Sequence, residues 1–276
     1  KFLITTKKFK SLLYLCAFIM QQTFYKYQGT GNDFVMIDNR QQIFDKNDTK
    51  RINHLCDRRF GIGADGLILL ENHPDFDFRM VYFNADGNES TMCGNGGRCL
   101  VAFAKQLGVI TNKAVFEAID GVHHATIDGN IVKLQMQDVD TIEKYKNHVF
   151  LNTGSPHHVQ FESHIEDFDI KSKGAKIRYG SPYNDAGTNV NFVKKVSDTT
   201  FRVRTYERGV EDETLSCGTG VTAVALAMHY IGETDKKHIT LNVEGGDLQV
   251  CFDVENDVYK YVWLIGPATF VYKGII

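Results

Sequence analysis

The sequence predicts an α+β protein made of two similar halves, in which most of the chain forms strands and each half has one central helix. Two observations support this prediction. A Cys-Gly-x-Gly motif occurs once in each half, and each copy leads directly into an apolar segment with helical spacing. Short apolar or β-branched runs separated by turn residues fill most of the remaining chain, which is typical of strands.

In the first half we expect a short helix over Asp48–Asp57, with Asp48 as its N-terminal cap. A broadly apolar helix should follow Cys93 and end at Gly108. Asp128-Gly129 is typical of a hairpin turn. The expected strands of this half are Leu67–Leu70, Phe78–Phe83, Ala114–Ile119, Val122–Ile127 and Ile131–Met136.

In the second half an apolar helix should follow Cys217 and end at Gly232. Gly245-Gly246-Asp247 and Glu255-Asn256-Asp257 predict turns. The boundary between the halves is expected near Asp138, where strand-like sequence gives way to a polar stretch. The expected strands of this half are His157–Phe161, Asn189–Lys194, Phe201–Tyr206, His238–Val243, Leu248–Phe252, Tyr259–Ile265 and Thr269–Tyr272.

Composition restricts the class of protein. The 276 residues suffice for two domains, and 43% hydrophobic with 24% charged residues is typical of a soluble globular protein. A net charge of −3 with both signs well mixed argues against nucleic-acid binding. The chain has six cysteines, but a chain with this much core needs no disulfides, so we expect free thiols in a reducing, cytoplasmic setting.

Residues 1–19 form a separate segment, with scattered lysines followed by an apolar run from Leu12 to Met20. The run is too short for a membrane span, which takes about 20 apolar residues. It resembles the start of a signal peptide, but no small-residue cleavage site follows. We interpret residues 1–19 as a leader or upstream extension, with the working protein starting at Met20. A targeting or membrane-attached segment and a true structural element are the alternatives.

The two cysteine motifs lie in matching surroundings. The segments Tyr82–Gly96 and Tyr206–Gly220, aligned without gaps, share Tyr, Glu, Cys, Gly and Gly at five equivalent positions. This pattern indicates one domain used twice, each copy presenting one thiol. Thiols on opposite sides of a cleft would place an acid and a base on opposite faces of one substrate carbon. That arrangement suits the inversion of a stereocentre.

Each motif cysteine directly precedes a helix. Free backbone N–H groups and the positive end of the helix dipole stabilise a nearby anion, so Cys93 and Cys217 should titrate below the ordinary thiol value of about 8.5. The same N–H groups could hold a substrate carboxylate. An isolated cysteine is more often a small buried hydrophobe, but the repeated context favours catalysis. The other four cysteines lack this context and are interpreted as structural: Cys16, Cys56, Cys99 and Cys251.

Metal and cofactor sites are not expected. No Cys-x-x-Cys pair occurs, and the pairs His123-His124 and His157-His158 lie in strand-like sequence, where neighbours point to opposite faces. The glycine-rich stretch Gly61–Gly66 matches neither the dinucleotide nor the P-loop pattern. No lysine stands out as an anchor for pyridoxal phosphate.

Several specific motifs together resemble the diaminopimelate epimerase family, whose members interconvert LL- and meso-diaminopimelate without a cofactor. The resemblance extends from Met20 to about Tyr272. The motifs are Gly29-Thr30-Gly31-Asn32-Asp33-Phe34, Phe83-Asn84-Ala85-Asp86-Gly87, Cys93-Gly94-Asn95-Gly96-Gly97-Arg98-Cys99, Gly154-Ser155-Pro156-His157, Gly187-Thr188-Asn189, Tyr206-Glu207-Arg208-Gly209 and Cys217-Gly218-Thr219-Gly220.

The resemblance implies two similar β-barrel-like domains, each around a central helix, with the active site in the cleft between them. The N-terminal domain would be residues 20–137 and the C-terminal domain residues 138–265. A returning strand, residues 266–276, would join the first domain and help to form a homodimer. The substrate would be the small molecule diaminopimelate, with no nucleic acid, membrane or cofactor involved.

The resemblance also implies roles for individual residues. Cys93 and Cys217 would be the acid–base pair, and His157 and Glu207 would support catalysis. The substrate-binding residues would be Asn32, Asn84, Gly94, Asn95, Asn189, Glu207, Arg208, Gly218 and Thr219. Asparagine amides recognise ammonium and carboxylate groups alike, Arg208 can grip a carboxylate with two hydrogen bonds, and Glu207 can accept from an ammonium.

Each of these polar residues also has an ordinary structural interpretation. Asn32 and Asn84 could be turn residues, Glu207 and Arg208 a solvated strand end, and His157 a core histidine bonded to backbone. The sequence departs from some family members at two positions, with Gly66 in place of glutamine and Ser155 in place of asparagine. An amide contact would be missing at the first position, and the side chain would be shorter at the second.

The expected activity is epimerisation at the α carbon of diaminopimelate, in lysine and cell-wall precursor biosynthesis. One alternative is another cofactor-independent racemase or isomerase of the same fold, such as a proline racemase relative. The Glu207-Arg208 pair and the asparagine set argue against it, since they suit a substrate with a charged group at each end. The other alternative is a non-catalytic amino-acid-binding relative, which would be expected to have lost a thiol.

Overall fold

The structure is a computed structural model that describes residues 21–276. The interpretation of residues 1–19, the start at Met20 and the assignment of Cys16 therefore lie outside the described residues. Within the described part, no helix combines the length and apolarity needed to cross a membrane.

The first half is a curved sheet around one helix. Its strands pair in chain order, and the helix α3 contacts strands on most sides of the sheet. The elements are β1 (Thr23–Gly29), β2 (Asn32–Asp38), α2 (Thr49–Cys56), β3 (Gly66–Glu71), β4 (Phe78–Asn84), α3 (Gly94–Gln106), β5 (Lys113–Ala118), β6 (Gly121–Asp128) and β7 (Ile131–Gln135).

The second half repeats this plan around the helix α5. Its elements are β8 (Ile142–Lys144), β9 (Val149–Asn152), β10 (Pro156–Phe161), α4 (Ile170–Tyr179), β11 (Asn189–Lys195), β12 (Thr200–Glu207), β13 (Asp212–Thr214), α5 (Gly218–Tyr230), β14 (His238–Val243), β15 (Gly246–Glu255), β16 (Val258–Pro267) and β17 (Thr269–Ile275).

The order of strand pairings is the same in both halves. From β1 to β7 the successive pairs are antiparallel, parallel, antiparallel, parallel, antiparallel and antiparallel. The series β9, β10, β11, β12, β14, β15 and β16 gives the same succession. The helices α2 and α4 follow the second strand of each series, and α3 and α5 follow the fourth. The predicted duplicated α+β architecture is confirmed.

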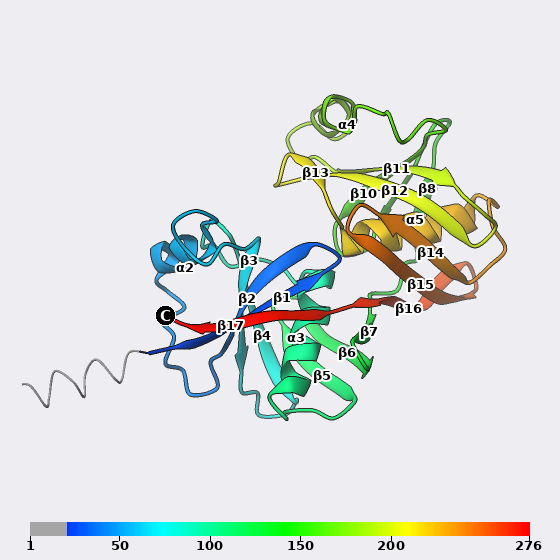
Figure 1. Cartoon of the computed structure of the whole chain (residues 1–276). Helices are drawn as coiled ribbons and strands as arrows, with labels where there is room; N and C mark the ends of the chain where they lie inside the picture. Colours follow the sequence, from blue (N-terminus) through cyan, green and yellow to red (C-terminus); the bar gives the residue numbers. More distant parts are fainter. Residues whose placement is uncertain (1–20) are drawn as a thin grey trace, which may run out of the picture.

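The last strand of the chain crosses to the other half: β17 follows β16 but pairs with β1 of the first half. β8 holds the corresponding place after β7, and it pairs with β9 of the second half. In addition, β7 and β16 pair with each other in an antiparallel ladder from Trp263↔Gln135 to Pro267↔Ile131. Figure 1 shows β16 and β17 running as one long path from the second half back across the first. The two halves are thus joined by strands as well as by the covalent chain.

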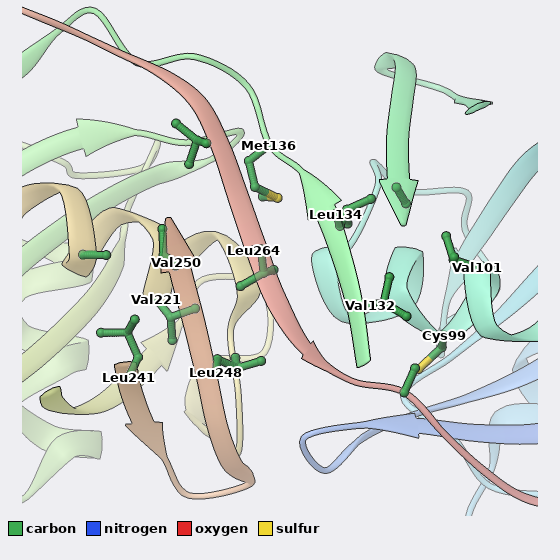
Figure 2. Packing of buried hydrophobic residues seen from close by; sticks show 14 of the residues in the cluster. Cys99, Val101, Val132, Leu134, Met136, Val221, Leu241, Leu248, Val250 and Leu264 are labelled. Atoms are coloured by element: carbon green, nitrogen blue, oxygen red, sulfur yellow. The ribbon is translucent and has the colours of Figure 1, made fainter. Parts of the chain in front are cut away.

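The core continues from one half to the other beneath this joint. Figure 2 shows Leu264 on β16, with Val250 and Leu248 of β15 on one side and Leu134 of β7 on the other. All four side chains are fully buried. Burial of aliphatic side chains contributes about 1.5–3 kcal/mol each, so this seam stabilises the contact between the halves as well as each half.

Local sequence explains the predicted helix ends. The Asp48 side chain accepts a hydrogen bond from the backbone N–H of Arg51 at 3.0 Å and so caps α2. Gly108 and Gly232 follow α3 and α5 with φ of 70° and 81°, a conformation that glycine adopts without strain. The helices predicted after Cys93, after Cys217 and over Asp48–Asp57 are therefore confirmed.

The structure also contains elements that the sequence did not predict. The helix α4 buries only Ile170, Gly174 and Arg178, so its pattern lacks an apolar stripe, although Asp169 caps it by accepting from the N–H of Ser172. Strands β1, β2, β8, β9 and β13 were likewise not predicted. Three of these five strands are only three or four residues long, which is too short for an alternating pattern to stand out.

Candidate active site

A cleft of about 1210 Å³ lies between the halves, and both motif cysteines line it. It contains residues from the cysteine motifs, the ends of β4 and β12, and the loops beside β2 and β10. Eleven of the residues predicted for the site line it: Asn32, Asn84, Cys93, Gly94, Asn95, Asn189, Glu207, Arg208, Cys217, Gly218 and Thr219. His157 does not line the cleft and is fully buried.

The two cysteines are the N-terminal cap residues of α3 and α5, and the starts of these helices meet. A Cβ placed on Gly218 would lie 3.2 Å from the Cα of Gly94, and one on Gly94 would lie 3.5 Å from the Cα of Gly218. Glycine at both positions lets the two helix starts approach each other. Unpaired backbone N–H groups of both helices therefore point into the same part of the cleft as the thiols.

Burial dominates the ionisation of both thiols. Loss of water contact raises the pKa of Cys93 to about 11, and the charge of Glu207 acts in the same direction. The backbone N–H groups of Gly96 and Asn95 oppose this shift but do not outweigh it. Burial and Glu207 also raise the pKa of Cys217. The prediction that both thiols titrate below their ordinary value is therefore wrong, because it counted the helix starts and not the desolvation.

A chain of hydrogen bonds leads from Cys217 into the second half. The Cys217 Sγ lies 3.5 Å from the Thr219 Oγ1, which lies 3.1 Å from the Ser155 Oγ. The Ser155 Oγ is 3.0 Å from the His157 Nε2, and the Asn191 amide donates to the His157 Nδ1 at 3.0 Å. Because Nδ1 accepts, Nε2 carries the proton and donates to Ser155. His157 is thus connected to Cys217 through Ser155 and Thr219, without direct contact.

His157 is neutral in this environment. Burial and, as the smaller cause, the positive charge of Arg208 together lower its pKa to about 3. The interpretation of His157 as a core histidine bonded to backbone is incorrect in detail, because both of its ring nitrogens bond to side chains. Ser155, the shorter side chain noted in the sequence, is the link between this ring and the cleft.

Cys93 faces an amide network of the first half. Its S–H donates to the Asn32 Oδ1 at 3.6 Å, and the Asn95 amide donates to the same oxygen at 3.3 Å. The Asn32 amide donates to Asp65 at 2.6 Å. Asn95 also donates to the carbonyl of Ser216 at 3.1 Å, next to the second cysteine. These contacts fix Asn32 and Asn95 by side-chain bonds, which a turn residue would not need.

Glu207 and Arg208 place opposite charges at the end of β12. The Glu207 carboxylate accepts from the Thr214 hydroxyl at 2.9 Å, and burial raises its pKa. The Arg208 guanidinium is exposed and donates to the carbonyl of Ala186 at 2.9 Å. Within residues 21–276 it forms no ion pair. The Arg208 charge therefore remains free to bind an anion in the cleft.

The other two predicted asparagines differ in how firmly they are held. Asn189 accepts from the backbone N–H of Arg208 at 2.9 Å and donates to Ser155 at 3.1 Å. Its amide is thus used by the protein itself. The Asn84 side chain is exposed at the end of β4 and has no hydrogen bond to another described residue, so it is available to a ligand.

The missing amide at Gly66 has a structural explanation. A Cβ at Gly66 would lie 2.5 Å from the carbonyl oxygen of Phe83 and 2.6 Å from the ring of Tyr82. No side chain fits there without displacement of the β4 backbone. The Tyr82 ring occupies this space and lines the cleft.

Several residues of the site were missed from the sequence, among them Ser216, Asp65 and Tyr82. The Ser216 carbonyl accepts a hydrogen bond from Asn95 across the two halves, and Asp65 holds Asn32. Their positions depend on pairings between distant parts of the chain, so no local pattern marks them; only Tyr82, which aligns with Tyr206 in the repeat, carried a signal. Cys56, Cys99, Cys93, Cys217 and Cys251 are all free thiols. No cluster of three metal-ligating side chains occurs among the residues that the structure describes.

The duplicated fold and its paired thiols place the chain in a class of two-domain proteins that have a cleft between matching halves. A phenazine biosynthesis protein of the PhzF family from Bacillus anthracis has this fold, with a TM-score of 0.74 at 12% identity over 93% of this chain and 99% of that one. A hydroxyproline epimerase from Agrobacterium vitis has it as well, with a TM-score of 0.68 at 14% identity over 93% and 91%.

Sequence comparison narrows this class to one family. The diaminopimelate epimerase family model matches residues 24–142 and 149–271. A diaminopimelate epimerase of Flavobacterium psychrophilum is 63% identical over 91% of this chain and 99% of its own length. One of Chlorobaculum tepidum is 42% identical over 90% and 98%. The chain belongs to the diaminopimelate epimerase family.

Proposed function

We propose that this protein interconverts LL- and meso-2,6-diaminopimelate by transferring protons at one α carbon between two thiols, without a cofactor. The observation that supports this most directly is the placement of Cys93 and Cys217. Each starts the central helix of its half, both line one cleft, and the two helix starts are in contact. The relatives named diaminopimelate epimerase support the choice of substrate.

In the proposed reaction, one cysteine enters as a thiolate and the other as a thiol. The thiolate takes the α hydrogen as a proton, and the electron pair of the broken C–H bond delocalises into the substrate carboxylate. The thiol then delivers its proton to the opposite face of the carbon. The carbon is inverted, and the two sulfurs have exchanged roles. Because each sulfur affects the proton affinity of the other, the pair titrates as a unit.

The α hydrogen of an amino acid is a very weak acid, so the planar intermediate must be stabilised. Negative charge grows on the carboxylate as the proton leaves. The backbone N–H groups at the starts of α3 and α5 can donate to it, and their orientation is fixed before reaction. The Gly94, Asn95, Gly218 and Thr219 positions supply this part of the proposed site.

The remaining proposed contacts hold the distal end of the substrate and its ammonium groups. Arg208 binds a carboxylate, Glu207 accepts from an ammonium, and Asn32, Asn84 and Asn189 complete the set. His157 supports catalysis from behind Ser155 by fixing the orientation of the Thr219 hydroxyl that faces Cys217.

Turnover of LL substrate in deuterated water tests the two-thiol reaction. The proton delivered comes from the second sulfur, which exchanges with solvent between turnovers. Product should therefore carry solvent deuterium from the earliest time points, while recovered substrate remains largely unlabelled. Transfer of the original hydrogen into product would contradict two bases. L-Proline serves as the control substrate, and its turnover in place of diaminopimelate would favour a proline racemase-like activity.

We further propose that residues 20–137 and 138–265 form the two domains and that residues 266–276 return to the first. The pairing of β17 with β1 supports this division. The setting we propose is the cytoplasm, where free thiols remain reduced and precursors for lysine and the cell wall are made.

A second copy of the chain is the proposed partner. On β17 the side chains of Phe270, Val271, Tyr272 and Ile275 are 40–64% exposed, and within the described residues this strand pairs only with β1. An apolar strand with a free edge favours association. Tyr272→Glu should yield a monomer in sedimentation experiments, whereas Tyr179→Glu on the exposed face of α4 should not change the mass. A monomeric unmodified protein would exclude the homodimer.

A further inference from the structure

One buried positive charge has no role in the proposed reaction. Arg98 lies in α3, five residues after Cys93, and its side chain is 0% exposed. The guanidinium donates to the Asn95 Oδ1 at 2.9 Å, the Gly94 carbonyl at 3.4 Å and the Thr30 hydroxyl at 3.4 Å. All three acceptors are neutral, and the Nε has no partner among the described residues. A buried charge without a counter-ion is costly to keep.

The surroundings of Arg98 leave no space for a carboxylate. A Cβ at Gly29 would lie 3.2 Å from the Nη2, and one at Gly266 would lie 3.3 Å from the Nε. Backbone of β1 and β16 thus encloses the guanidinium. Its position near the start of a helix adds to the cost, because the helix dipole disfavours a cation there. An anion that forms nearby would offset the cost of keeping this positive charge buried.

The thiols of Cys93 and Cys99 are the groups whose negative charge would favour the charged form of Arg98. Cys99 is fully buried within the hydrophobic core and does not line the cleft. Cys93 does line it. The charged or titratable groups that act on or near Cys93 are Glu207, Tyr82, Cys217, Cys99 and Arg98, and among these only Arg98 favours a thiolate there.

The repeat shows that this charge belongs to one half only. Thr222 is the counterpart of Arg98, five residues after Cys217, and it is also fully buried. Its hydroxyl donates to the Gly218 carbonyl at 2.9 Å, as the Arg98 Nη1 donates to the Gly94 carbonyl. The two halves therefore share the hydrogen bond to the first glycine of the motif. They differ in the charge, while Glu207 disfavours ionisation of both sulfurs.

We infer that Arg98 is a positioning residue whose fixed charge selects Cys93, rather than Cys217, as the sulfur that is negative before substrate binds. This inference rests on the proposed two-thiol reaction. It assigns the resting states of a pair that the reaction alone leaves interchangeable: Cys93 begins as the base and Cys217 begins as the acid. The substrate isomer whose α hydrogen faces Cys93 then binds to an enzyme in which Cys93 is already the thiolate.

Titration of each sulfur by itself tests the inference. In Cys217→Ser, the pH dependence of alkylation by iodoacetamide is measured at Cys93, with labelled peptides identified by mass spectrometry. In Cys93→Ser, the same is measured at Cys217. Midpoints are compared rather than rates, because Cys93 is also the more accessible sulfur. A lower midpoint for Cys93 is expected, and an equal or lower midpoint for Cys217 would overturn the inference.

Substitutions at Arg98 test its part directly. In the Cys217→Ser background, Arg98→Met should raise the Cys93 midpoint by about one pH unit or more, the size expected when an opposite charge nearby is lost. Arg98→Lys should keep the midpoint near that of the parent. In the Cys93→Ser background, Arg98→Met should shift the Cys217 midpoint much less. The matched control Thr222→Val removes the equivalent hydrogen bond without changing charge, and it should leave the Cys93 midpoint in place.

An unchanged Cys93 midpoint in Arg98→Met, or an equal shift at both sulfurs, would overturn the role of Arg98. If Arg98→Met does not fold, Arg98→Gln, which also removes the charge, takes its place in both single-thiol backgrounds with the same expected result. Turnover rates cannot replace these measurements, because the equilibrium constant forces kcat/KM in both directions to change by the same factor. The titrations use no substrate, so absence of epimerase activity would contradict the proposed function and leave their result standing.

Discussion

The side chains that touch the two sulfurs do not titrate near neutral pH. Cys93 contacts the amide of Asn32, and Cys217 contacts the hydroxyl of Thr219. Neither group can take a proton from the sulfur that it touches. The proposed chemistry therefore depends on the sulfurs themselves, and on the burial and charges that set their proton affinity.

Removal of either sulfur should abolish epimerisation. Cys93→Ala and Cys217→Ala each leave one face of the carbon without a proton partner, and a loss of about 10²-fold or more is expected in steady-state assays. Cys251→Ala is the control, since this half-buried thiol on β15 does not line the cleft. Activity above about a tenth of the parent in either motif variant would refute the two-thiol assignment.

The low pKa of His157 predicts a specific dependence of stability on pH. The neutral ring is favoured in the folded protein, with a pKa of about 3, whereas the unfolded ring titrates near 6.5. Between these values the unfolded chain binds more protons, so stability falls as pH falls. The unfolding free energy of the parent, measured relative to that of His157→Gln, should decline from about pH 6.5 towards pH 3. A difference that is independent of pH would show that the folded ring has the same pKa as the unfolded ring.

At the scale of elements, the helices α3 and α5 were predictable because their signals are local. An apolar face and a following glycine mark both. What the sequence could not give is the contact between their first residues, which depends on how two distant segments fold together. The same reason explains why α4 was missed. Its place beside β11 and β12 is set by tertiary contacts and not by its own pattern.

The contact between the helix starts predicts an effect of Gly218→Ala. The new methyl group would lie 3.0 Å from the Leu264 side chain and 3.2 Å from the Gly94 backbone, so the two helices must separate. A fall in kcat of about tenfold or more is expected, because displacement of catalytic groups by fractions of an ångström is costly. Steady-state kinetics with LL substrate measures it.

Two further variants isolate the cause. Gly97→Ala, one turn into α3, meets only the flexible side chains of Leu134 and Met92 and should keep most activity. Combining Gly218→Ala with Leu264→Val relieves the side-chain contact but not the backbone contact. Full recovery in this double variant would show that spacing between the helices is not what limits the rate.

For the whole molecule, the duplication could be predicted from the repeated cysteine motif, but no local pattern predicts the crossing of the last strand. Nothing in the local sequence of β17 indicates that it pairs with β1 of the first half. The family resemblance supplied the return of residues 266–276. The site, too, was predicted only in part. The two thiols were predicted from the repeat and the polar residues from the family resemblance. The hydrogen bonds through Ser155 and Ser216 were predicted from neither.

The crossing of β17 predicts a local response to truncation. A chain ending at Pro267 leaves β1 without its antiparallel partner from Thr23 to Gln28. Amide hydrogen exchange should accelerate in β1 and β2, and the melting temperature should fall. The pair β11 and β12 in the other half serves as the internal control and should remain protected. Unchanged protection of β1 would mean that β17 contributes little to the first half.

The shared pairing order and the mutual pairing of β7 with β16 mean that an approximate two-fold rotation relates the halves. A rotation about an axis in the plane of a trigonal carbon exchanges the two faces of that carbon. It therefore accounts for two equivalent sulfurs. If the axis lies along the bond to the carboxylate, the rotation also exchanges the other two substituents, the amino group and the side chain. A perfectly symmetric protein could therefore not distinguish these two groups.

The protein can therefore distinguish the amino group from the side chain only through residues that differ between the two halves. The counterparts of Glu207 and Arg208 are Phe83 and Asn84, which carry no charge. The proposed recognition of an ammonium group by Glu207 and of the distal carboxylate by Arg208 thus lies at positions where the halves have diverged. The proposed proton transfer lies at positions where they have not.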